Sequence, residues 1–246
     1  MRNFKLLLAY DGSRYKGWQR LGDTENTIQG KLEAVLSRMT GSDVAVIGSG
    51  RTDAGAHAAG QVANFHADTQ KSPEEIRDYL QQYLPEDIGV ISVEEADPRF
   101  HSRFHVQQKT YVYRIWTSDQ PCIFERKYVW PVRVQFDLCA MKEAAAHFLG
   151  SHDFTAFCSN KHFKKSAERT IYALDVEEAG PELRFTVSGD GFLYNMVRIM
   201  VGTLLAVGRG ELQPADIPAI LESRDRTRAG ETVPARGLCL MEVQYP

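Results

Sequence analysis

The sequence predicts an α+β protein made of two similar layered domains, with mostly antiparallel sheets that meet at a central cleft. Strand-like apolar runs alternate with a few helical stretches, and the same broad order recurs in both halves of the chain. With 246 residues, 43% of them hydrophobic and 25% charged, each half is large enough for its own core. Because a basic stretch begins just after Asp97-Pro98, we place the domains at residues 1–98 and 99–246.

The first half is expected to form strands and helices in the order β-α-β-β-α-β. A strand over 3–10 ends at the turn signal Asp11-Gly12, and a loop follows. Apolar residues at helical spacing predict a helix from the capping residue Thr27 to Met39. Ser72-Pro-Glu-Glu opens a second capped helix. The other strands of this half are expected at 44–47, 61–66 and 88–93.

The second half is expected to run strand, helix, two strands, two helices and a final strand. These elements are predicted at 106–117, 136–148, 171–176, 183–187, 192–207, 217–221 and 238–245. The helix over 192–207 is the most apolar of the chain, so it should be packed on nearly all sides. One charge, Arg198, lies in its middle. A buried guanidinium without a partner is costly, so a carboxylate is expected nearby.

Composition excludes several classes of protein. The apolar run near the N-terminus is too short for a signal peptide or a membrane span, so we expect a cytoplasmic protein without membrane contact. The four cysteines lack Cys-x-x-Cys spacing, which indicates reduced thiols. Two sets of residues could in principle surround a metal ion, but neither has the spacing of a zinc module. The first set is His101 with His105, and the second is Cys139, His147, His152 and Cys158. We therefore expect no metal site.

The charge distribution favours a nucleic-acid partner although the net charge is −3. Residues 68–97 hold nine acids and two bases, whereas residues 99–133 hold seven bases and two acids. The segment 161–169 adds further basic residues. Aromatic residues such as Phe104 and Tyr113 are interleaved with the basic stretch, a composition that contacts phosphate and stacks on bases. Solvated charged faces are the alternative.

The glycine-rich stretch 48–57 places one acid, Asp53, in a turn directly after an apolar run. Glycines let the backbone approach a ligand, and the small neighbours Ala54 and Ala56 leave the carboxylate accessible. The stretch fits neither a dinucleotide fingerprint, which requires glycine at 53, nor a P-loop, which ends in Gly-Lys-Ser/Thr. Either an active-site acid or an ordinary turn, whose Asp caps the next element, accounts for these residue types.

Over essentially the whole chain the sequence resembles the tRNA pseudouridine synthase A family. The motifs that carry the resemblance are Ala9-Tyr-Asp-Gly12, Gly17-Trp-Gln19, Gly50-Arg-Thr-Asp-Ala-Gly55 with His57, Gly60-Gln-Val62, Phe100-His-Ser-Arg103, Lys109-Thr-Tyr-Val-Tyr113, Arg169-Thr-Ile171, Phe192-Leu-Tyr-Asn-Met-Val-Arg198, Val201-Gly202 and Gly237-Leu-Cys-Leu240. Two departures are Ala56, where valine is usual, and Asn64, where histidine is common. Neither removes a reacting group.

The resemblance implies an isomerase that converts uridines 38, 39 and 40 of the tRNA anticodon arm to pseudouridine, as a homodimer without metal or cofactor. It implies Asp53 as the catalytic carboxylate, Tyr111 stacked on the target base, and Arg198 paired with the acid. Arg51 would enter the RNA helix as the target nucleotide flips out. RNA contacts are further expected from the basic side chains Arg103, Lys109, Arg114, Lys164 and Lys165.

Other interpretations of the same residues stay open. Tyr111 could be a half-buried strand tyrosine, Arg198 a surface arginine and Arg51 a plain phosphate contact. The competing functions are a non-catalytic RNA-binding protein on the same fold and a nucleosidase-like enzyme. A second carboxylate, which glycoside hydrolysis normally needs, is not evident beside Asp53. His57 is expected to brace the Asp53 loop through hydrogen bonds.

Overall fold

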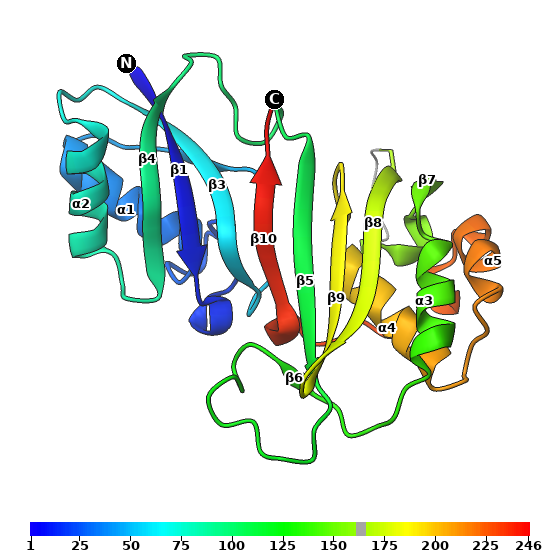
Figure 1. Ribbon diagram of the computed structural model, residues 1–246. Helices are drawn as coiled ribbons and strands as arrows, with labels where there is room; N and C mark the ends of the chain where they lie inside the picture. The colour runs from blue at the N-terminus through cyan, green and yellow to red at the C-terminus, as the bar shows by residue number, and fades with distance from the viewer. Residues whose placement is uncertain (161–165) are drawn as a thin grey trace. The chain divides into compact units, whose positions relative to one another are not determined.

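The computed structural model describes residues 1–160 and 166–246 as a mixed α+β chain whose strands pair mostly in antiparallel fashion (Figure 1). Close backbone contacts divide the chain into two compact units. The first unit holds Met1–Gln107 and Cys239–Pro246, and the second holds Gln108–Leu238. This grouping differs from the predicted division at 98/99, because the segment before 108 and the last eight residues lie with the first unit. The cleft between two domains stays a prediction.

The first unit is a sheet with two helices. Its strands lie in the order β4-β1-β3-β10, and β2 pairs with β3. The strands are β1 (Arg2–Tyr10), β2 (Val46–Gly48), β3 (His57–Ala67), β4 (Ile88–Ala96) and β10 (Leu238–Gln244). All these pairs are antiparallel except that of β10 with β3. The predicted order β-α-β-β-α-β is confirmed for the first hundred residues.

The two helices of this unit begin where their capping residues predict. Helix α1 (Ile28–Thr40) begins after Thr27, whose side chain accepts a hydrogen bond from the backbone of Gly30, and ends at Gly41 with φ of 73°. Helix α2 (Pro73–Tyr83) begins with a capping box formed by Ser72 and Glu75. Both helices turn apolar residues inward, including Leu32 and Leu80, which are fully buried.

The second unit is built on the antiparallel order β5-β9-β8-β7, with the short β6 paired in parallel to β5. Its strands are β5 (Gln108–Trp116), β6 (Trp130–Pro131), β7 (Gly150–Asp153), β8 (Glu168–Ala179) and β9 (Glu182–Gly189), and its helices are α3 (Leu138–Ala146), α4 (Met196–Gly208) and α5 (Asp216–Ser223). Helices α3 and α4 pack together; α3 also contacts β8, and α4 contacts β5. The sequence did not predict β6 and β7.

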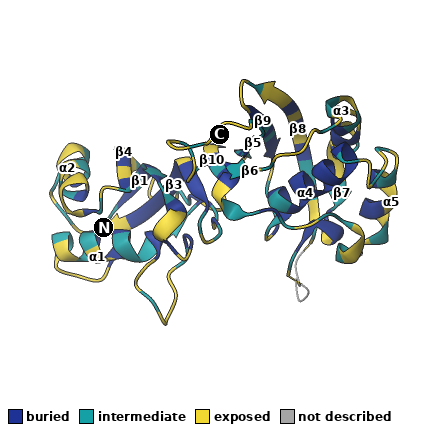
Figure 2. Cartoon of the chain, turned by 90° about the horizontal axis from the view of Figure 1, so that it is seen from below, coloured by how far each residue is buried: buried dark blue, intermediate teal, exposed yellow. Residues whose placement is uncertain are grey.

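Helix α4 is the core helix of the second unit (Figure 2). Every one of its residues except Arg198 is buried, which confirms the prediction of a helix packed on nearly all sides. The predicted start at residue 192 is wrong: the helix begins at Met196, because Asn195 adopts a left-handed conformation with φ of 63°. Residues 192–195 instead form a turn that leads into the helix.

Candidate active site

Asp53 lies in a tight turn between β2 and β3 of the first unit. Its backbone carbonyl accepts a hydrogen bond from the amide of Ala56 at 3.1 Å, and Gly55 in this turn has φ of 81°. That positive φ is a conformation that glycine adopts without the steric cost of a side chain. Asp53 is half-buried and its neighbour Ala54 is exposed. The turn therefore holds the carboxyl group at a partly open place, as an active-site acid requires.

A buried polar network holds the residue before Asp53. The hydroxyl groups of Tyr10 and Thr52 lie 2.8 Å apart, and the Gln61 amide nitrogen lies 3.4 Å from the Tyr10 hydroxyl. The Ser49 hydroxyl donates to the other end of the Gln61 amide at 2.6 Å. Burial raises the pKa of Tyr10, so its hydroxyl stays protonated and able to donate. The network ties β1 and β3 to the start of the Asp53 turn.

A second support comes from the segment 12–18, which packs directly under the turn. The amide of Trp18 donates to the carbonyl of Thr52 at 3.1 Å, and the amide of Gly55 donates to the carbonyl of Tyr15 at 3.3 Å. A Cβ atom on Gly12 would collide with the carbonyl of Ala56. Glycine is thus required at position 12 by a close approach of two backbone segments.

This segment was expected to be loop-like and rich in possible ligand contacts. In the structure Trp18 is only 2% exposed and packs against Gly48, so its indole supports the turn from inside. Sequence reasoning missed this supporting role, and also that of Tyr10, Ser49 and Gln61. The available signal was that most of these residues lie in the motifs that carry the family resemblance.

His57 braces the same turn by a hydrogen bond, as expected from its position. Its Nδ1 accepts from the amide of Gly12 at 3.1 Å, and Asp11 Oδ1 lies 3.3 Å from the same nitrogen. The ring of His57 thus links the start of β3 to Asp11 and Gly12.

Tyr111 lies in the middle of β5 in the second unit and is 7% exposed. Its ring meets the ring of Phe192 edge to face, with 5.1 Å between the centroids and 82° between the planes. Phe192 belongs to the turn before α4, so this contact ties the strand tyrosine to the segment that leads to Arg198.

Arg198 projects from α4 and is half-buried. Its Nε donates to the carbonyl of Val233 at 2.7 Å, and its Nη1 donates to the side-chain oxygen of Asn195 at 2.8 Å. The amide nitrogen of Asn195 in turn donates to the Ser159 hydroxyl at 3.0 Å. These two oxygens thus fix the plane of the guanidinium. The carboxylate partner expected for Arg198 stays a prediction.

The other predicted RNA-binding residues occupy different environments. Arg51 is exposed beside the Asp53 turn, Arg103 is exposed on the segment between β4 and β5, and Lys109 is half-buried in β5. Lys164 and Lys165 lie outside the described residues. Asp53, Arg51 and Arg103 belong to the first unit, and the predicted active-site residues Tyr111 and Arg198 belong to the second. That Asp53 meets the two others stays a prediction.

Arg114 makes ion pairs inside the second unit. Its guanidinium is held by both carboxylate oxygens of Glu182, at 2.5 and 2.9 Å, and by Glu125 at 2.9 Å. Glu182 is 4% exposed and also pairs with Arg184 at 3.0 Å. Burial acts to raise the pKa of Glu182, but the hydrogen bonds from Arg114 and Arg184 outweigh it and lower that pKa. These ion pairs occupy guanidinium donors that a phosphate contact would use.

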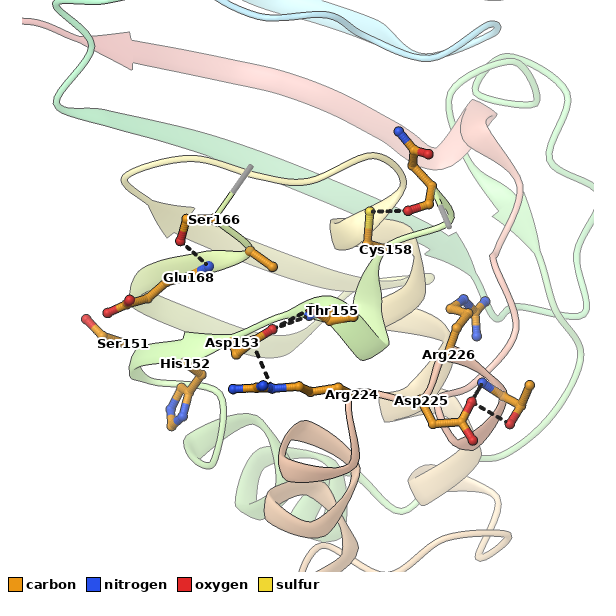
Figure 3. A pocket seen from close by; sticks show the side chains of 13 residues that line it. Ser151, His152, Asp153, Thr155, Cys158, Ser166, Glu168, Arg224, Asp225 and Arg226 are labelled. Atoms are coloured by element: carbon orange, nitrogen blue, oxygen red, sulfur yellow. Dashed lines mark hydrogen bonds and ion pairs between the residues drawn. The ribbon is translucent and has the colours of Figure 1, made fainter. Parts of the chain in front are cut away.

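A cavity of about 870 Å³ also lies in the second unit (Figure 3). Its lining holds both acids and arginines. Arg224 pairs with Asp153 at 2.9 Å, and Asp225 accepts from the backbone and hydroxyl of Thr227. Neither Asp53, Tyr111 nor Arg198 lines this cavity, so its size does not identify it as the reacting site.

The described part of the chain shows neither a metal-binding cluster nor a membrane-spanning helix. Across residues 1–160 and 166–246, no three or more His, Cys, Asp or Glu side chains are grouped so that they could hold a metal ion. His105 Nδ1 instead accepts a hydrogen bond from the amide of His101 at 3.3 Å. Within the same described ranges, no helix has both the length and the apolar character needed to cross a bilayer.

Comparison with known proteins gives consistent results. The family model described as tRNA pseudouridine synthase matches residues 7–106 and 144–246. A relative named tRNA pseudouridine synthase A, from Bacillus sp. strain KSM-64, is 49% identical over 245 residues, which is 100% of each chain. One named tRNA pseudouridine synthase A 1, from Clostridium tetani strain Massachusetts/E88, is 45% identical with the same coverage. Another, named tRNA pseudouridine synthase A 2, from Bacillus cereus strain ZK/E33L, is 48% identical over the same span. The chain therefore belongs to the tRNA pseudouridine synthase family.

Proposed function

We propose that this chain isomerises uridine to pseudouridine in tRNA, at positions 38, 39 and 40 of the anticodon arm, with Asp53 as the essential carboxylate. Family membership supports the reaction class. The assignment of Asp53 rests on the structure of its turn. A buried hydrogen-bond network of Tyr10, Thr52 and Gln61 holds this turn in place, while Asp53 itself is half-buried. An acid held this rigidly can act on a substrate without first being reorganised.

The reaction exchanges one bond of the uridine for another. The bond from C1′ to N1 breaks, the uracil turns over, and a bond from C1′ to C5 forms. The proton on C5 is lost and N1 gains one, so no oxidant, reductant or cofactor is consumed. When the glycosidic bond breaks, the sugar acquires oxocarbenium character, which a nearby carboxylate stabilises.

Three roles for Asp53 are compatible with this chemistry. The ionised carboxylate could stabilise the sugar cation electrostatically, attack C1′, or add to C6 of the ring. Each role needs a carboxylate that is ionised and close to the uridine. Each also needs water to be kept away while the uracil turns, since water would hydrolyse the sugar.

Tyr111 and Arg198 are assigned supporting roles in the same reaction. Tyr111 stacks on the target base, with its ring angle fixed by Phe192. Arg198 pairs with Asp53, keeps it ionised and orients it. The contacts of Arg198 to Val233 and Asn195 support this role, because they fix the direction of its guanidinium.

RNA binding is assigned to the basic side chains. Arg51 is exposed beside the catalytic turn and takes the space left when the target nucleotide flips out, which offsets part of the cost of unstacking. Arg103, Lys109, Lys164 and Lys165 contact phosphates. Arg114 contributes by holding β5, because its donors are engaged by acids. We further propose that the enzyme works in the cytoplasm as a homodimer, which the mass in solution tests.

The proposal is tested by incubating the purified protein with an unmodified tRNA transcript, without added metal or cofactor. Carbodiimide treatment followed by primer extension is expected to give stops at positions 38 to 40 for the native protein and none for Asp53→Asn. The Asn variant is nearly isosteric and should bind tRNA within a few-fold of the native affinity. Release of free uracil would indicate a nucleosidase. Tight tRNA binding without stops would indicate a binding protein.

A further inference from the structure

A second cavity of about 230 Å³ lies in the second unit and is lined by residues from the end of β5 and from the long segment that joins β5 to β6. Figure 1 shows the course of that segment. Its floor is apolar and includes Trp116, Pro121 and Val129. Three arginines, Arg126, Arg133 and Arg236, also line it. No described residue of its lining is acidic, which distinguishes it from the larger cavity, whose lining includes Asp153, Glu168 and Asp225.

Neither of the acids nearest to Arg126 in sequence pairs with it. Glu125 is adjacent to Arg126 but pairs with Arg114 at 2.9 Å, and Asp119 is not part of the lining. Arg126 donates to the carbonyl of Ile123 at 2.5 Å, a neutral group that leaves its charge uncompensated. Arg126, Arg133 and Arg236 are all exposed, so an anion can reach them from solvent. Arg126 and Arg133 at one opening create a positive potential that favours a phosphate group.

The floor of the cavity adds an aromatic surface to this charge. Trp116 is half-buried, and its indole nitrogen donates to the carbonyl of Gln120 at 2.9 Å, which fixes the orientation of the ring. Fixed aromatic rings beside arginines bind nucleotides, because the ring stacks on a base while the guanidinium contacts phosphate. The cavity is smaller than the roughly 300–1,000 Å³ of sites that enclose a whole small molecule. It suits one nucleotide of a polymer.

We infer that this cavity binds a phosphate and the adjoining nucleoside of the tRNA substrate at a position other than the target uridine. The inference rests on the proposed function. Trp116 and Tyr111 lie on the same strand, about 17 Å apart at the usual rise per residue, and five residues of separation turn their side chains to opposite faces. The cavity is therefore a separate subsite on the unit that carries Tyr111.

The test uses the full-length protein with the double substitution Arg126→Gln and Arg133→Gln. Both side chains are exposed, so the fold should be preserved. The dissociation constant for a tRNA transcript is measured over a series of salt concentrations, together with kcat and KM for pseudouridine formation. At about 100 mM salt we expect the dissociation constant and KM to rise about tenfold or more, and the salt slope to fall by about one per lost phosphate contact. The value of kcat should stay within about twofold of that of the native protein.

A matched control removes two positive charges elsewhere. Arg77→Gln with Lys142→Gln changes the net charge equally, and neither residue lines the cavity. If the cavity variant and this control give the same affinity and the same salt slope, the inference is wrong. It is also wrong if the cavity variant changes only the mass in solution, which would indicate an interface between copies. The inference is wrong, too, if uridine monophosphate quenches the fluorescence of Trp116 but does not compete with tRNA for binding.

The failure of this inference can be told apart from the failure of the proposed function. If the native protein forms no pseudouridine but its tRNA binding still depends on Arg126 and Arg133, the reaction assignment fails and the subsite stands. If pseudouridine forms with the same KM in the native protein and the cavity variant, the reaction stands and the subsite fails.

Discussion

The hydroxyl groups of Tyr10 and Thr52 lie 2.8 Å apart in the interior of the first unit, and Thr52 immediately precedes Asp53. Tyr10→Phe should leave the Thr52 hydroxyl without this partner, lower the free energy of unfolding by about 1–2 kcal/mol and reduce kcat more than it raises KM. Urea denaturation and steady-state kinetics on tRNA measure both effects. The control is Tyr172→Phe, at a tyrosine that is 50% exposed, which should change neither.

The same tyrosine predicts a dependence of stability on alkaline pH. Burial raises the folded-state pKa of Tyr10 above its ordinary value of 10.0, whereas the unfolded chain ionises near that value. The associated stability is complete below pH 10 and declines as the pH rises further, by up to about 1.4 kcal/mol per pH unit. Tyr10→Phe should therefore show a shallower fall in unfolding free energy above pH 10. An unchanged slope would contradict the assignment.

Gly12 predicts a contrast between two glycine substitutions. Gly12→Ala places a Cβ against the carbonyl of Ala56, so the turn that carries Asp53 must shift. We expect a loss of about 2 kcal/mol or more in unfolding free energy and a clear fall in kcat. Gly22→Ala meets nothing within 4 Å and should leave both quantities unchanged. Equal behaviour of the two variants would show that the close approach at Gly12 is unimportant.

Replacing Arg198 with lysine keeps the positive charge but is expected to reduce kcat strongly. Arg198→Lys cannot hold Val233 and Asn195 at once, so the cation loses its fixed direction. We expect kcat to fall about 100-fold or more, with a smaller change in KM. Arg209→Lys, at the end of the same helix where the guanidinium pairs with Glu211, is the control. Near-native kcat in Arg198→Lys would remove the guanidinium geometry from the mechanism.

The ion pairs of Arg114 predict that this arginine stabilises the fold and does not contact tRNA. Arg114→Gln removes one of the two cations that pair with the buried Glu182 and leaves Arg184. It should lower the unfolding free energy by about 3 kcal/mol. The salt slope of tRNA binding should not change. A slope reduced by about one would instead assign Arg114 a phosphate contact.

The pKa of Glu182 predicts how the stability from these ion pairs changes at acidic pH. Its folded-state pKa lies below the ordinary value of 4.5, because hydrogen bonds from Arg114 and Arg184 outweigh the opposing effect of burial. The stability it contributes is therefore present above that pH and is lost as the pH falls below it. Glu182→Gln should be less stable at neutral pH and less sensitive to acid than the native protein. Glu178→Gln, at an exposed site of β8, should follow the native profile.

Local sequence signals predicted the elements whose causes are local. Thr27 and Ser72 cap the helices that follow them, and Gly41 ends α1 in the left-handed conformation. The start of α4 was misjudged because the apolar residues 192–193 continue the helical pattern, while the backbone of Asn195 interrupts it. Strand β7 reads Gly-Ser-His-Asp and forms only because β8 lies beside it.

The parts that could not be predicted depend on residues far apart in the chain. Strand β10 pairs with β3 through Cys239 and Leu240, about 180 residues after its partner, and nothing near residue 239 specifies that pairing. Arg114 finds Glu182 across 68 positions. The residue types at 48–57 left open whether Asp53 is catalytic or a plain turn residue; the family motifs favoured catalysis, and the supports from Tyr10, Gly12 and Gln61 became visible only in the fold.

The most direct test of Asp53 as the essential carboxylate follows the proton on C5 of uridine. A tRNA transcript carrying tritium at C5 of its uridines loses that label to water when C5 becomes bonded to C1′. The native protein should release tritium up to the number of modified uridines, and Asp53→Asn should release none while still binding the transcript. Tritium release by Asp53→Asn at a rate near the native one would contradict the central claim.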